Sequence, residues 1–367
     1  MKRRWVTAAC AHSVLLAACS SAGFQKMPVQ PEEAYASPCQ ISRIEISARL
    51  DIPAGYRLSG TAFGGISGID YSPVTDEWLL VSDARQADGG THVYRVRGAN
   101  LGSGLFSSGE LEAAEALARL PEGSVRPLVD AEAIRFAGDG RSFYLATEGE
   151  ESSGIEPGIL RWDFSEQFAK SIPLAGPPSN GTGAPASRTV RANLSFEGLS
   201  NSPDSDGLWY GLEGPYQEEG DLPTLEHGAL VPIVHIDYDG RFIRDFRYSV
   251  EPIAAQLPGR LADNGLSEIL ALKGDRFLVL ERSGTQQDDS TFRFTGRLFC
   301  AWKEDRTAVL RKTLITEINS LGSFERMNFE GMTFGPTLPD GRTSLVLVND
   351  NNFVPETPTT ILMLAID

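Results

Sequence analysis

Apolar residues along the chain fall mainly into alternating or continuous runs of four to eight residues, which is the pattern of β-strands. Short segments rich in Gly, Pro, Asp and Ser separate these runs, and such residues favour tight turns. The segment Glu110–Leu120 has a composition that also suits a helix, but its place in the series of strands favours a strand. The pattern therefore predicts an all-β fold.

A short motif occurs five times, and it consists of an apolar residue, a Ser or Glu, usually a small residue, and a second apolar residue. The copies read ISGI, AEAI, FEGL, LSEI and FEGM, and their second positions are Ser67, Glu132, Glu197, Ser267 and Glu330. These positions are 65, 65, 70 and 63 residues apart, which is too regular for chance. Regular self-similarity of this kind is typical of repeat architectures.

Each copy of the motif opens the same series: an apolar strand, a turn, and a second strand that ends in an acid. The five terminal acids are Asp83, Glu148, Glu213, Glu281 and Asp350. Third and fourth strands follow in most units, but the last unit ends after its third strand, Thr360–Ile366. The run Ile41–Leu50 can supply the missing strand, which is how a β-propeller closes its ring. We predict one five-bladed β-propeller domain over residues 39–367, with a six-bladed ring containing one degenerate blade as the alternative.

The N-terminal residues have the features of a signal for export. Three basic residues, Lys2, Arg3 and Arg4, precede an apolar run that ends in Leu-Ala-Ala-Cys at Cys19. This ending looks like a bacterial lipobox, so we predict a lipoprotein signal peptide over residues 1–19 with lipidation of Cys19; an ordinary signal with an incidental Cys19 is the alternative. Residues 20–38 are predicted to be a flexible tether. The protein is then exported and lipid-anchored to the bacterial envelope, at the outer membrane, on its periplasmic or surface side.

Cysteine usage and charge narrow the class of protein further. Cys39 and Cys300 lie outside the signal and are able to pair in an oxidising compartment, although the sequence leaves the pairing open. The formal net charge is −16, and loss of the three basic signal residues makes it about −19. Such acidity argues against nucleic acid as a partner and leaves the lipid on Cys19 as the expected membrane contact. We expect a monomer.

In a propeller, the first strand of each blade lines the central channel and the second strand returns antiparallel to it. The five motif positions should therefore form an inner ring, and the five terminal acids an outer circle at the same rim. Unpaired carboxylates in a narrow channel repel one another, and a hard cation removes that repulsion. Calcium takes six to eight oxygen ligands, so we predict a calcium site formed by the inner ring: Ser67, Glu132, Glu197, Ser267 and Glu330. The alternative is that these residues cap strands by hydrogen bonds to the backbone.

Arginines occur in the same connections, and guanidinium groups at an acidic rim are able to clamp phosphate. Predicted substrate-binding residues are Arg85, Arg126, Arg191 and Arg282. Ion pairs with neighbouring acids are the alternative role for each of them. The outer carboxylates Glu148 and Glu213 are predicted to act as general base. The substrate is then a small phosphorylated or ester compound.

The segments GGISGID, DAEAI, LSFEGL, LSEIL and NFEGM, together with the acid-ended second strands, resemble the phytase-like family, also described as "esterase-like activity of phytase". The resemblance extends from about Gly64 to the C-terminus. It implies secretion, a propeller, and phosphoester or ester hydrolysis. The Ser, Glu, Glu, Ser, Glu order is also similar to the axial calcium ring of calcium-activated nucleotidases (apyrases), which implies the same five metal ligands. A non-catalytic, calcium-stabilised binding propeller is the competing function.

Overall fold

The computed structural model describes residues 39–58, 60–85, 89–97, 111–115, 117–119, 125–175, 188–304 and 307–367. The predicted signal peptide, the lipidated Cys19 and the tether over residues 20–38 lie outside the described residues. Among the described residues, no helix has the length and apolar character required to cross a membrane.

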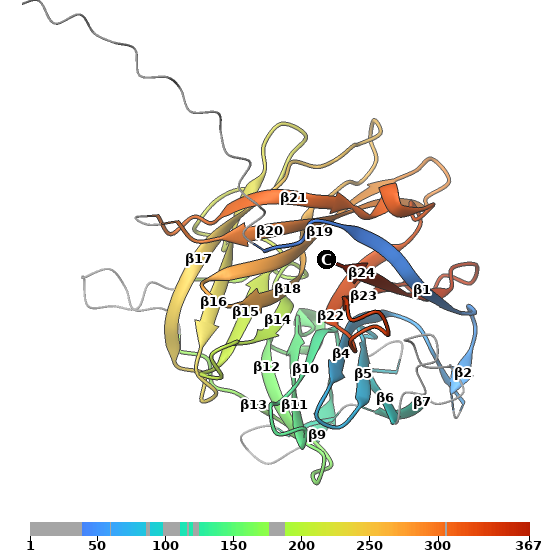
Figure 1. Cartoon of the computed structure of the whole chain (residues 1–367), viewed down its shortest axis with the longest axis vertical. Helices are drawn as coiled ribbons and strands as arrows, with labels where there is room; N and C mark the ends of the chain where they lie inside the picture. Colours follow the sequence, from blue (N-terminus) through green and yellow to red (C-terminus); the bar gives the residue numbers. More distant parts are fainter. Residues whose placement is uncertain are drawn as a thin grey trace, which may run out of the picture. The chain divides into compact units, whose positions relative to one another are not determined.

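Five antiparallel sheets surround one axis, and we number them as blades 1 to 5 (Figure 1). Blade 1 contains β4 (Ile66–Ser72), β5 (Glu77–Ser82), β6 (His92–Arg97) and β7 (Leu111–Glu115). Blade 2 contains β10 (Ala131–Phe136), β11 (Ser142–Thr147), β12 (Gly158–Asp163) and β13 (Ala169–Ser171). Blade 3 contains β14 (Phe196–Asn201), β15 (Leu208–Leu212), β16 (Ala229–Ile236) and β17 (Phe242–Val250). Blade 4 contains β18 (Gly265–Leu272), β19 (Arg276–Gln286), β20 (Phe292–Trp302) and β21 (Arg311–Glu317).

Blade 5 closes the ring with the strand nearest the N-terminus. It contains β22 (Asn328–Phe334), β23 (Thr343–Asp350), β24 (Thr359–Ile366) and β1 (Ile44–Ile52). β1 pairs antiparallel with β24 from Ile44 opposite Ile366 to Ile52 opposite Thr359. The innermost strands β4, β10, β14, β18 and β22 contact one another in a closed cycle. The predicted five-bladed propeller, closed by the N-terminal strand, is therefore confirmed.

The segment between blades 1 and 2 forms strands, as predicted, but it is divided between two sheets. β7 is the outer strand of blade 1, whereas β8 (Leu117–Arg119) pairs in parallel with β13 of blade 2. β9 (Val125–Pro127) pairs with β8 and extends blade 2 to six strands. The remaining elements among the described residues are the small hairpin of β2 (Arg57–Leu58) and β3 (Thr61–Ala62) and two 3-10 turns, η3 (Glu151–Ser153) and η4 (Ile318–Leu321).

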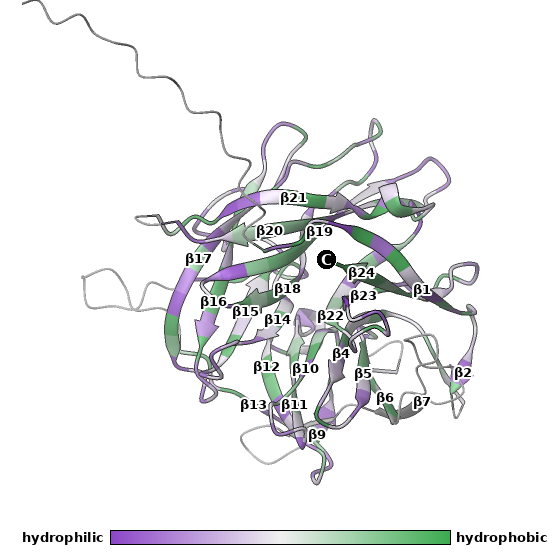
Figure 2. Cartoon of the chain, in the orientation of Figure 1, coloured by the Kyte–Doolittle hydropathy of each residue, from purple (hydrophilic) through white to green (hydrophobic). Residues whose placement is uncertain are grey.

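Five apolar layers fill the spaces between neighbouring blades. Figure 2 shows hydrophobic segments along the strands of the blades. Successive residues of one strand belong to different layers: Leu79 packs with residues of blade 2, and Leu80 packs with residues of blade 5. This follows from the period of two along a strand, because both faces of each blade are covered by its neighbours. Continuous apolar runs such as WLLV in β5 therefore mark strands buried on both faces.

A buried ion pair crosses the channel between the inner strands. Arg135 Nη2 lies 2.6 Å from Glu268 Oε2, and both side chains are at most 2% exposed. Arg135 also donates to the carbonyl oxygens of Ile69 and Met332, each at 2.9 Å. Glu268 Oε1 accepts a hydrogen bond from the backbone of Leu199 at 2.9 Å. These two side chains therefore connect all five blades near the axis.

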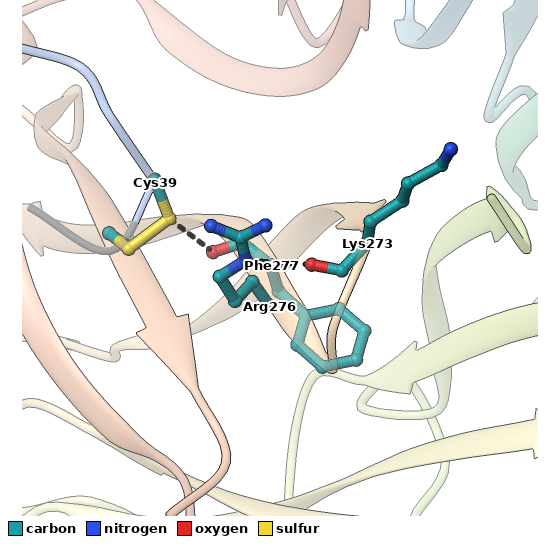
Figure 3. Close-up of a disulfide and its surroundings, with 5 residues drawn as sticks. Cys39, Lys273, Arg276 and Phe277 are labelled. Atoms are coloured by element: carbon teal, nitrogen blue, oxygen red, sulfur yellow. Dashed lines mark hydrogen bonds between the residues drawn. A yellow bond between two sulfur atoms is a disulfide. The ribbon is translucent and has the colours of Figure 1, made fainter.

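Cys39 and Cys300 are joined by a disulfide, with their Cα atoms 5.9 Å apart. Cys300 belongs to β20 of blade 4, and Cys39 Sγ lies 3.7 Å from the carbonyl oxygen of Phe277 (Figure 3). The disulfide therefore ties the segment before β1 to the blade next to the one that β1 completes.

Candidate functional site

The five inner-ring positions share one backbone feature. In each innermost strand, the residue at the motif position has no partner in the second strand, so the strand carries a β-bulge there. The unpaired residues are Ser67, Glu132, Glu197, Ser267 and Glu330. A bulge redirects the side chain of its extra residue and is common beside functional sites. The repeat in the sequence is therefore a repeat of bulges at one rim of the channel.

The outer circle contains four acids and one arginine. Strand pairing and backbone hydrogen bonds place Asp83, Glu148, Glu213, Arg282 and Asp350 at equivalent positions. The prediction that Glu281 belongs to this circle is wrong, because β19 continues beyond Glu281 to Gln286 and the next residue takes the position. The carboxylate of Glu281 instead accepts hydrogen bonds from Tyr248 Oη at 2.6 Å and Lys312 Nζ at 2.7 Å.

These side chains line a pocket of about 650 Å³ at the channel mouth. The pocket is lined by three inner-ring residues, Glu132, Glu197 and Glu330, and by all five residues of the outer circle. Ser67 and Ser267 are not among its lining residues. Ser67 Oγ instead donates a hydrogen bond to Glu330 Oε2 at 3.3 Å.

Two groups of three carboxylates gather at one side of the pocket. The first is Asp130, Glu132 and Glu148, and the second is Glu148, Glu197 and Glu213. Within each group, the ligand atoms lie within 4.8 Å of one another, and Glu148 belongs to both. Glu330 lies outside both groups and accepts from Asn328 Nδ2 at 2.7 Å. These two groups therefore belong to blades 2 and 3, while Asp83, Glu330 and Asp350 line the pocket from blades 1 and 5.

Among the four predicted arginines, the structure brings two to the pocket. Arg282 is largely buried, and its guanidinium contacts Glu213 and Glu330, each at 3.3 Å, and Asp263 at 3.0 Å. Arg85 Nε donates to Asp130 Oδ1 at 3.3 Å, and half of its side chain is exposed.

Arg126 and Arg191 do not line the pocket. Arg126 donates to the carbonyl oxygen of Gly154, and Arg191 donates to those of Pro215 and Gly220. Loop backbone holds both guanidinium groups outside the pocket wall, and their contact with substrate stays a prediction. Arg326, which precedes Glu330 by four residues, also lines the pocket from an exposed loop.

Burial and mutual repulsion shift these acids toward their protonated forms. Burial, followed by the charges of neighbouring carboxylates, raises the pKa values of Glu132 and Glu197 well above the usual range. Burial also raises the pKa of Glu148 to about 7. The pKa of Glu213 rises to about 8 through burial, although Arg282 opposes the shift. Burial raises the pKa of Asp130 to about 6 against the opposing charge of Arg85.

The donor set fits a hard divalent cation. Asp130 is 3% exposed, and its Oδ2 has no hydrogen-bond partner among the described residues. Asn328 Oδ1 is also buried and without a partner there. Buried oxygens are normally satisfied, so these two atoms are free to coordinate a cation. Carboxylate and amide oxygens are the ligands that calcium prefers.

Two glycines provide the space that the outer acids occupy. A Cβ atom on Gly65 would lie 2.2 Å from Asp83 Oδ1, and one on Gly265 would lie 2.3 Å from Glu213 Cγ. Gly65 also has a φ of 59°, in the left-handed region that favours glycine. The two glycines immediately precede the ISGI and LSEI motifs, so they occupy equivalent positions in blades 1 and 4.

Several residues of the pocket wall escaped sequence reasoning. Asn193, Phe292, Phe294 and Val354 line the pocket but lie outside the repeated motif. Only Phe292 and Phe294 carried a signal in the sequence, since they alternate with polar residues in a strand. Whether these two side chains reach the pocket depends on the length of the β19–β20 hairpin, and the repeated motif does not specify that length.

The comparisons with solved structures return distant matches. The β-propeller domain of the Trilobed protease from Pyrococcus furiosus is 13% identical, with a TM-score of 0.29, over 82% of this chain and 69% of that chain. MPT-4, a mannose phosphorylase from Leishmania mexicana, is 9% identical, with a TM-score of 0.44, over 85% and 86%. The catalytic domain of the Coprinopsis cinerea GH62 α-L-arabinofuranosidase is 10% identical, with a TM-score of 0.43, over 88% and 97%. None of these similarities carries an argument about activity.

No curated protein matches the chain in sequence. The sequence model of one family, described as "Phytase-like: Esterase-like activity of phytase", matches residues 61–353, which is more than half of the chain. The match spans all five repeats of the motif and the acids that line the pocket, except Glu356. The chain therefore belongs to the Phytase-like family.

Proposed function

We propose that this propeller is a calcium-dependent phosphoester hydrolase that acts on a small phosphorylated substrate at the acidic pocket. The observation that carries the proposal is the pair of carboxylate groups that share Glu148, at the wall of a pocket that also contains Arg85 and Arg282. Anionic oxygens bind cations, and the cations together with the arginines bind a phosphoryl group. Hydrolysis of a carboxylic ester is the second substrate class that the family description suggests.

Calcium would be held first by the two carboxylate groups, Asp130, Glu132 and Glu148 on one side and Glu148, Glu197 and Glu213 on the other. When bound, calcium supplies positive charge that attracts a phosphoryl oxygen and stabilises the charge that develops there. Glu330 and the two ring serines are further ligands in this proposal. For Ser67, that role requires its hydroxyl to leave Glu330.

The chain's own residues bind the substrate and move a proton. Arg85 and Arg282 neutralise phosphoryl oxygens, and the exposed half of Arg85 leaves its guanidinium accessible from the pocket. Glu148 or Glu213 accepts a proton from water as the water oxygen bonds to phosphorus. The bond between phosphorus and the ester oxygen breaks, and the departing alkoxide takes up the proton that the carboxylate has accepted, which releases the alcohol and restores the carboxylate.

Release of p-nitrophenol from p-nitrophenyl phosphate tests this proposal, with p-nitrophenyl acetate as the ester substrate. We expect turnover of the phosphate compound with calcium and its loss with a chelator. Glu148→Gln and Glu213→Gln should each lower kcat by about 100-fold or more. Glu226→Gln makes the same change in an exposed loop and serves as the control. Turnover that survives the chelator, or both pocket variants, would refute the proposal.

A calcium-stabilised binding propeller without catalysis is the second candidate. The observation that favours it is that the second carboxylate group joins Glu148 of blade 2 to Glu197 and Glu213 of blade 3. A cation held there would fasten two blades whether or not a reaction follows. A rise of Tm with calcium and no turnover of any phosphoester or ester would favour the binding propeller over the hydrolase.

Export and lipid anchoring at Cys19 form a separate part of the proposal. They are supported by the basic start, the apolar run and the Leu-Ala-Ala-Cys ending of the signal. Metabolic labelling with a fatty acid, compared between the native chain and Cys19→Ser, tests the anchor. Equal labelling of both would contradict it.

A further inference from the structure

One wall of the pocket carries two parallel aromatic rings. Phe292 and Phe294 belong to β20, two residues apart, so they point to the same face of the β19–β20 hairpin. Their ring centroids are 6.1 Å apart, and the ring planes differ by 18°. Both side chains are partly exposed and line the same pocket as the carboxylates. The pocket therefore offers an apolar aromatic surface beside its charged groups.

The hairpin that carries these rings is longer than its counterparts. β19 and β20 each have 11 residues, whereas β5 and β11 each have 6. The backbone of Phe294 donates to the carbonyl oxygen of Glu325 at 2.7 Å, and Asn319 Nδ2 donates to that of Phe294 at 2.9 Å. These bonds hold the hairpin against the loop that contains Arg326, so the aromatic wall is fixed in place.

We propose that this wall binds a planar aromatic ring, so that the pocket selects phosphomonoesters of aromatic alcohols. This inference rests on the proposed phosphoester hydrolysis and adds the class of alcohol. Flat rings stack on exposed aromatic side chains with little cost in conformational entropy. The pocket volume of about 650 Å³ accommodates one ring together with a phosphoryl group.

The charge of the pocket limits the other end of the substrate. Among the described residues, eleven carboxylates and three guanidinium groups line the pocket. Carboxylates therefore outnumber guanidinium groups, and each further phosphate group on a substrate would increase its repulsion from the pocket. A substrate with one phosphoryl group and a neutral remainder meets less repulsion. The aromatic wall provides the surface that such a remainder needs.

Binding of phenylphosphonate and methylphosphonate to the calcium-loaded full chain tests the inference, because neither compound can be hydrolysed at its carbon–phosphorus bond under these conditions. Isothermal titration calorimetry should find phenylphosphonate bound about tenfold more tightly. Phe292→Ala and Phe294→Ala should each remove most of this preference, and Phe292→Leu should remove part of it. Arg293→Ala changes the opposite face of the same strand and should keep the preference.

The outcomes separate the two proposals. Equal binding of the two phosphonates to the native chain would overturn the aromatic subsite and leave phosphoryl binding intact. Failure of both to bind would overturn the phosphoester proposal and the subsite with it. A preference that persists in Phe292→Ala and Phe294→Ala, with the fold intact by circular dichroism, would also overturn the assignment to this wall.

Discussion

The channel contains two buried charged sites that are built in opposite ways. Between the inner strands, Arg135 pairs with Glu268, and both receive or donate further hydrogen bonds from the surrounding strands. At the mouth, carboxylates face other carboxylates, and Arg282 is already shared among three of them. The first site balances its charge within the protein, and the second has more carboxylates than positively charged groups.

The neighbours of a single carboxylate in each site show the difference. Burial raises the pKa of Glu268 to about 7, but Arg135 and two backbone amides all oppose that shift. Burial raises the pKa of Glu197 as well, and there the named neighbours are all carboxylates that raise it further. Neighbours that favour the charged form stabilise the fold, whereas neighbours that oppose it make the site suited to bind a cation.

Removing one partner of the balanced site should have the largest effect. Arg135→Met leaves Glu268 buried and unpaired, and it also removes the contacts of Arg135 with blades 1 and 5. We expect the free energy of unfolding to fall by about 3–5 kcal/mol, measured by denaturant titration. The double variant Arg135→Met/Glu268→Met is the control and should recover part of the loss. A loss below about 1 kcal/mol in the single variant would contradict this role for the pair.

Calcium should stabilise the unbalanced site. At 100 times its dissociation constant, calcium is expected to add about 3 kcal/mol to the free energy of unfolding, because it binds the folded chain alone. Thermal unfolding with calcium and with a chelator measures the change. Glu197→Gln should reduce the calcium-dependent part, while Glu226→Gln should leave it as in the native chain. An identical Tm with and without calcium would exclude the site.

The stability of the calcium-free chain should depend on pH because of the carboxylates at the channel mouth. Burial raises the pKa values of Glu148 and Asp350 to about 7 and that of Glu213 to about 8. These values lie above those of unfolded carboxylic acids, about 4, so folding favours the protonated forms. Stability should be highest below about pH 4 for these groups and should fall as the pH rises through about 7 to 8. Denaturant unfolding at a series of pH values with a chelator measures this fall in stability. Calcium should make the fall smaller. A free energy of unfolding that rises between about pH 4 and pH 8 without calcium would contradict the raised pKa values.

The smallest effect is expected for a substitution that fills the space beside Glu213. Gly265→Ala would place a Cβ atom 2.3 Å from Glu213 Cγ, so Glu213 must move. We expect calcium affinity to fall by about 1–2 kcal/mol, measured by calorimetry. Gly158→Ala lies in a strand with open space around it and is the matched control. Equal calcium affinity in both variants would show that Glu213 does not need this position.

The sequence predicted those parts of the fold that repeat. The motif recurs because every inner strand makes the same bulge at the same rim, so Glu132, Glu197 and Glu330 could be placed together without coordinates. Strand ends were less predictable. An acid at the end of an apolar run marks the outer circle only where the strand stops there, and β19 runs on past Glu281.

Residues that act across blades could not be predicted from one repeat. Glu268 was visible as a departure from the small residue of the motif, but its partner Arg135 belongs to another blade. Arg126 and Arg191 each lie six residues before the ring glutamate of their blade. Such spacing does not fix the direction of a side chain in a loop, and both guanidinium groups bond to loop backbone. The direction of an arginine side chain in these loops depends on which backbone carbonyl oxygens lie within its reach.

The disulfide between Cys39 and Cys300 determines how mechanical force enters the propeller. β1 is held to β24 by backbone hydrogen bonds, which a pull on the chain end would open one after another. Because Cys39 precedes β1, tension applied upstream passes through the covalent bond into β20 before it reaches the closing strand. A protein tethered by its N-terminus would thus keep its ring closed under load while the bond is intact.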